Sequence, residues 1–110
     1  MATDYERFVK QCKKTLRALG IDGAWDLRFL RGKSSDRIAE CALEVGAHMG
    51  EVTFFEHSRT MCEPARAARH EMAHVLLAEL SELARNRYAT EGEIMRAEES
   101  ICIVLEKVLP

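Results

Sequence analysis

Apolar residues recur at helical spacing at both ends of the chain and alternate with polar residues in its middle. Phe8, Cys12 and Leu16 stand four residues apart and predict a first helix over about residues 4–18. Three short alternating segments then predict strands, at residues 25–29, 39–45 and 51–55. Helical spacing returns in two further segments, at about residues 64–84 and 91–108. The pattern predicts an α+β fold with an N-terminal helix, a small, mostly antiparallel three-stranded sheet and two C-terminal helices.

Capping residues mark the ends of the predicted helices. Thr3 with Glu6, and Thr90 with Glu93, have the spacing of a capping box, and Gly20 is a natural stop for the first helix. Pro64 suits the first turn of the long helix. We expect that helix to bury one apolar stripe, formed by Ala68, Met72, Val75, Leu76, Leu80 and Leu83.

The length of 110 residues allows one domain, so we assign residues 1–110 to a single unit. No apolar run is long enough to cross a bilayer, and the first six residues lack the basic start of a secretory signal. We therefore expect a cytoplasmic protein whose four scattered cysteines are reduced thiols.

Charge is unevenly distributed along the chain. Residues 1–37 carry nine Lys and Arg against five Asp and Glu, whereas residues 38–110 carry seven against thirteen. The acidic part also holds all four histidines, a combination that suits a metal ion better than a phosphate backbone. The basic residues of the first helix fall on its solvent face, so the sequence does not favour a nucleic-acid partner.

The long helix contains the motif His70-Glu71-Met72-Ala73-His74, which holds the residues of the candidate metal site. Its two histidines stand about 1.1 turns apart, so both imidazoles can bind one ion. Glu71 is too close to His70 in sequence to bind the same ion easily, and is placed to take a proton from a metal-bound water as a general base. The plain alternative is a solvated helix that carries this motif by accident.

A catalytic zinc needs a third protein ligand, usually from another element. Glu98 and Glu99 of the last helix are the candidates. Glu98 shares a helix face with Ile94 and Ile101, where a carboxylate would be costly unless it met a cation. We therefore favour Glu98 as the third ligand over Glu99.

With this motif and a downstream glutamate, the chain resembles the zincin metallopeptidases, specifically the gluzincins, in a minimal form of the compact bacterial and phage kind. The metzincin branch is excluded because no histidine follows His74. The resemblance implies a zincin-like fold in which His70, His74 and Glu98 hold Zn²⁺. It further implies hydrolysis of peptide or protein substrates by a zinc-bound water, with Glu71 as the base.

The chain departs from larger gluzincins in three ways. Their zinc glutamate is followed one turn later by a Ser-Asp pair, whereas Ile101-Cys102 follows Glu98 here. The oxyanion donor has only two candidates, Tyr88 and His57. A substrate-binding subdomain is missing, so a protein partner is expected to complete the cleft unless the cleft is open and shallow. Two alternatives stay open: a zincin-fold accessory or regulatory protein that binds zinc with weak or no catalysis, and a small interaction module.

Overall fold

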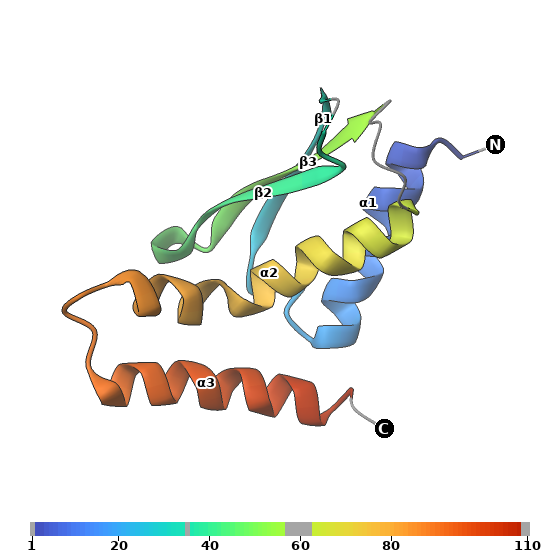
Figure 1. Cartoon of the computed structure of the whole chain (residues 1–110). Coiled ribbons are helices and arrows are strands. Elements are labelled where there is room, and N and C mark those ends of the chain that lie inside the picture. Colours follow the sequence, from blue (N-terminus) through green and yellow to red (C-terminus); the bar gives the residue numbers. More distant parts are fainter. Residues whose placement is uncertain (1, 35, 57–62, 109–110) are drawn as a thin grey trace.

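A computed structural model describes residues 2–34, 36–56 and 63–108, which form three α-helices and one small sheet (Figure 1). The elements in chain order are α1 (Asp4–Leu19), β1 (Asp26–Lys33), β2 (Ala39–Glu44), the short 3-10 turn η1 (Val45–Ala47), β3 (Met49–Glu56), α2 (Pro64–Arg85) and α3 (Glu91–Glu106). The predicted α+β class and element order are confirmed. No helix in this part of the chain is long and apolar enough to cross a membrane.

The sheet is mixed, whereas the sequence pattern predicted mostly antiparallel pairing. Its strand order is β1-β3-β2, with β3 antiparallel to β2 and parallel to β1. The tight η1 turn makes β2 and β3 a hairpin, which leaves the other edge of β3 open. Strand β1 fills that edge, pairing Asp26 with Met49 at one end and Lys33 with Glu56 at the other. Both β1 and β2 are therefore edge strands.

The predicted helix caps are present. The Thr3 side chain accepts a hydrogen bond from the Glu6 amide, and Gly20 closes α1 with a positive φ of 71° that glycine adopts without strain. Thr90 and Glu93 form the complete capping box at the start of α3. These local hydrogen bonds satisfy amide and carbonyl groups that a helix leaves unpaired at its ends, so the boundaries follow closely from the sequence.

The core lies between α1, α2 and the central strand β3. Its buried side chains are Phe8, Cys12, Leu16, Val52, Phe54, Ala67, Ala68, Met72 and Val75. The buried side of α2 is rotated from the predicted stripe: Ala67, Glu71 and Ala78 are buried, while Leu76, Leu80 and Leu83 are only half-buried. The reason is tertiary, because α1 and the sheet cover one side of α2 more fully than α3 covers the other.

Helix α3 lies along the side of α2 that is remote from the sheet (Figure 1). Val75 and Leu76 of α2 and Ala97 and Ile101 of α3 line a small cavity of about 130 Å³ between them. Ala97 is the one fully buried side chain of α3, and Glu98 is exposed. The expectation that Glu98 lies on the buried side of the last helix is therefore wrong by one step of about 100° around the helix.

The turn between β2 and β3 is tied to α2 by His48, which has a left-handed φ of 51°. One of its ring nitrogens, Nδ1, lies 3.1 Å from the Ala24 carbonyl oxygen, and the other, Nε2, lies 2.8 Å from the Glu79 carboxylate. The Trp25 ring stacks on the imidazole with a centroid separation of 4.9 Å. These contacts fix the turn above the second half of α2, where it forms one wall of the groove described below.

Candidate metal centre

Helix α2 places His70, Glu71 and His74 within reach of one another. One potential ligand atom from each side chain lies within 4.8 Å of the other two. Among the described residues, this is the one group of three such side chains that could hold a metal ion. Helix geometry alone accounts for the pairing of the two histidines, because residues four apart stand on the same face.

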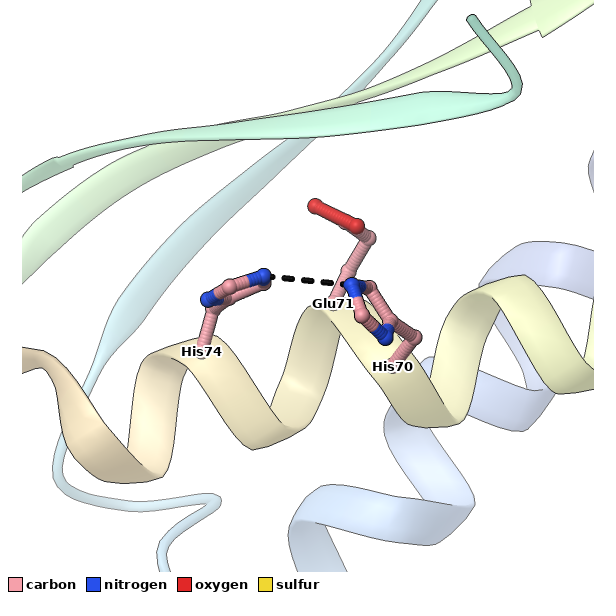
Figure 2. Close-up of side chains that lie close together, drawn as sticks. All are labelled: His70, Glu71 and His74. Carbon is pink, nitrogen blue, oxygen red and sulfur yellow. Dashed lines mark hydrogen bonds between the residues drawn. The ribbon is translucent and has the colours of Figure 1, made fainter.

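The two imidazoles face each other along the helix (Figure 2). Their Nε2 atoms are 3.2 Å apart and share a hydrogen bond, with one ring donating and the other accepting. Two nitrogens bound to a tetrahedral zinc at about 2.0–2.1 Å each would be about 3.3 Å apart. The spacing of the histidine pair is therefore compatible with a shared metal ion as well as with the hydrogen bond between the rings, and both rings are exposed to solvent.

Glu71 points in a different direction from the histidines, up from the helix toward the sheet (Figure 2). The residue is only 7% exposed and is the one buried charged residue in the described part of the chain. A buried carboxylate is costly unless cations or hydrogen-bond donors surround it, so a metal ion bound by the neighbouring histidines would offset the cost of burying Glu71.

Two cysteine thiols lie on the inner side of Glu71. The Cys41 thiol of β2 donates a hydrogen bond to the backbone carbonyl of Glu71, with the sulfur 3.6 Å from the oxygen. Burial, and to a smaller extent the Glu71 carboxylate, raises the pKa of the Cys12 thiol to about 12. The same two causes raise the pKa of Cys41 further. Both thiols are therefore neutral at physiological pH and contribute apolar, weakly donating surroundings rather than charge.

A groove of about 650 Å³ begins at His74 and runs along the second half of α2. Its floor comes from α2 and its opposite wall from β2 and the η1 turn; the lining includes Leu43, Val45, His74, Leu77, Ala78, Ser81, Glu82 and Arg85. The floor residues recur every three or four positions, so they continue the helix face that carries the histidines. The groove is open to solvent and extends about 16 Å from His74 to Arg85 at 1.5 Å per residue.

The structure does not bring the predicted third ligand to this group. Glu98 is exposed on α3, and the side of α2 that meets α3 includes Leu76, which lies about 200° around the helix from His74. The histidines and α3 therefore lie on different sides of α2. The role of Glu98 as a ligand stays a prediction, and it requires α3 to lie elsewhere when the ion is bound.

The position of α3 relative to the histidines can be tested by measuring the zinc affinity of variants of this helix. With α3 packed against Val75 and Leu76 of α2, neither Glu98→Ala nor Glu99→Ala should change the zinc dissociation constant, because neither glutamate belongs to the His70–Glu71–His74 group. The two variants remove the same charge from neighbouring positions of one helix, so each controls for the other. A loss of zinc affinity confined to Glu98→Ala, measured by competition with a chelating dye, would show that α3 delivers the third ligand.

Of the two predicted oxyanion donors, the one that the structure describes, Tyr88, does not lie at the histidine pair. Tyr88 is 79% exposed and follows the end of α2, beyond Arg85, while His57 lies outside the described residues. No sequence pattern indicates that Cys41 is a neighbour of Glu71, because the two are thirty residues apart and meet only through the packing of β2 on α2. The groove wall at Leu43 and Val45 could not be predicted either, because these residues are distant in sequence from the α2 residues that they face across the groove.

Comparison with protein-family models, with curated proteins and with solved structures gives no match. The resemblance to zincins therefore rests on the motif and on the order of the elements. The structure adds that the His-Glu-x-x-His residues lie together in a way that suits a metal ion.

Proposed function

We propose that this protein is a zinc-dependent hydrolase of peptide bonds, with the zinc held by His70 and His74 and with Glu71 as the general base. The observation that carries the proposal is the 3.2 Å separation of the two Nε2 atoms beside a buried carboxylate. Two surface histidines that bind no metal ion would not need a buried glutamate next to them. The groove that begins at His74 offers room for an extended chain on one side of the site.

The donor set fits zinc better than the harder cations. Two imidazole nitrogens suit zinc and other transition metals, whereas magnesium and calcium prefer ligands that are all oxygen. Two protein nitrogens leave open positions, one of which Glu98 would fill if α3 moved toward the site, and an open position is what distinguishes catalytic from structural zinc sites.

A zinc ion bound there would act as a Lewis acid and lower the pKa of a water molecule to about 7. The protein itself supplies the proton transfer: the Glu71 carboxylate accepts a proton from the attacking water and then returns it to the leaving amine. On its buried side, Glu71 lies next to the neutral thiols of Cys12 and Cys41, which do not compete for that proton. The exposed side of the histidine pair leaves the site accessible to a substrate.

One observation favours the alternative, a zinc-binding accessory or regulatory protein with weak or no catalysis. Within the described residues, the hydrogen-bond partner of each histidine ring is the other histidine. Efficient zinc enzymes usually orient each ligating imidazole with a carboxylate or carbonyl on its second nitrogen, and losing such a partner costs about 10–100-fold in metal affinity or activity. An ion bound without that support would be held more loosely.

The proposal is tested by removing and restoring the metal. Protein stripped with a chelator should take up one zinc per chain on dialysis and regain cleavage of an unstructured protein such as casein in proportion to the zinc bound. Uptake of zinc without any cleavage would support the accessory role, and failure to take up zinc would contradict both.

A further inference from the structure

The outer face of α3 is an unpartnered surface that mixes apolar and acidic side chains. Met95, Glu99, Cys102 and Glu106 recur at the spacing of a single helix face, on the side opposite the buried Ala97. Met95 is 60% exposed and the neighbouring Ile103 is 43% exposed, which is a high exposure for two large apolar side chains on one short helix. Such a face is typical of a contact surface.

The charge on this face indicates the chemistry of its partner. Glu98, Glu99 and Glu106 are exposed and border the apolar side chains, and they outnumber the two exposed cations beside Ile103, Arg96 and Lys107. Two copies of α3 cannot pack face to face favourably, because like charges placed opposite each other are destabilising. The partner surface must instead be cationic, with some apolar area to cover Met95 and Ile103.

The outer face of α1 has these properties. Lys10, Lys13, Lys14 and Arg17 are exposed, and the ion pairs formed by described residues involve none of them. Tyr5 and Val9 line a shallow groove of about 440 Å³ together with Glu6, Lys10, Lys13 and Arg17, and the Arg31 guanidinium lies over the Tyr5 ring. The aliphatic stems of the lysines add further apolar area.

The two helix faces also match in spacing. Glu6, Lys10, Lys13 and Arg17 follow the same intervals along α1 as Met95, Glu99, Cys102 and Glu106 along α3. With the helices side by side in parallel, Lys10 would face Glu99 and Arg17 would face Glu106. Glu6 and Lys13 would face Met95 and Cys102, so the apolar cover of these two side chains would come from aliphatic carbons. We propose that α3 of one molecule packs on α1 of a second copy of this chain, as a charge-complementary contact between two different faces.

A contact of this kind has a consequence for assembly. Each molecule keeps one free α1 face and one free α3 face after pairing, so the contact extends into open chains unless the rotation happens to close a ring. Because the pairing charges are exposed, salt should weaken it: the Debye length falls from about 30 Å at 0.01 M to about 3 Å at 1 M ionic strength.

The test uses two charge-reversal variants of the full chain, followed by sedimentation velocity at low salt. The first carries Lys10→Glu and Arg17→Glu, and the second carries Glu99→Lys and Glu106→Lys. Each variant alone presents two faces of like charge, so its association constant should fall more than about tenfold, since like charges at an interface cost several kcal/mol. An equimolar mixture restores opposite charges at both contacts and should associate again.

A control variant with Arg66→Glu and Arg87→Glu makes the same change in net charge as the first variant, at exposed positions outside α1 and α3, and should associate like the wild type. Circular dichroism spectra confirm that each variant is folded. A wild-type protein that stays monomeric at low salt and high concentration would overturn the proposal. So would association that survives in either charge-reversal variant alone, or a mixture that does not associate.

Discussion

His74→Ala should abolish specific zinc binding, with the zinc dissociation constant rising by more than about 100-fold. Even substitutions of groups that only orient a metal ligand cost about 10–100-fold in affinity, so loss of a direct ligand should cost more. The substitution leaves His70 alone on this face of α2, because the Nε2 atoms of the pair are the two nitrogens that lie 3.2 Å apart. Isothermal titration of metal-free protein with zinc measures the effect.

The matched control is His48→Ala. His48 is also partly exposed, but it contacts Ala24 and Glu79 and does not belong to the His70–Glu71–His74 group. We expect this variant to lose some stability, because two hydrogen bonds and the stacking on Trp25 disappear, while its zinc affinity stays at the wild-type value. Equal zinc binding by His74→Ala and the wild type would contradict the assignment of the metal centre.

Glu71→Gln should lower peptide hydrolysis by about 10²–10⁴-fold, which is the usual contribution of a general base. Glutamine keeps the size and shape of the side chain, so the buried space beside Cys41 remains filled. It cannot accept a proton as a carboxylate does. Zinc content should not change, because the two imidazoles that hold the ion are untouched. The measurement compares initial rates of peptide cleavage at equal zinc occupancy.

Glu91→Gln is the matched control for Glu71→Gln. Glu91 is an exposed carboxylate in the first turn of α3 and belongs neither to the groove lining nor to the His70–Glu71–His74 group. Its substitution makes the same chemical change without touching the proposed base, so the rate should stay near the wild-type value. Loss of zinc from Glu71→Gln would make Glu71 a ligand, and an unchanged rate would mean that another group takes the proton.

Features that depend on contacts within a few residues could be predicted from the sequence alone. The caps at Thr3 and Thr90 and the stop at Gly20 set their helix ends through hydrogen bonds within a few residues. The closeness of His70 and His74 has the same origin, because a helix places residues four apart on one face whatever surrounds it. The predicted element order and the candidate metal pair were therefore readable without a structure.

Tertiary packing determines which strands pair and which helix faces are covered. The parallel pairing of β1 with β3 depends on which strand edge is free after the hairpin forms, and no local pattern records that. The contact of Cys41 with Glu71 and the exposure of Glu98 depend on which sides of α2 the sheet and α3 cover. Apolar residues at helical spacing predict that a helix has a buried face. They do not predict which element covers that face, because the apolar surfaces of elements distant in sequence all compete for burial.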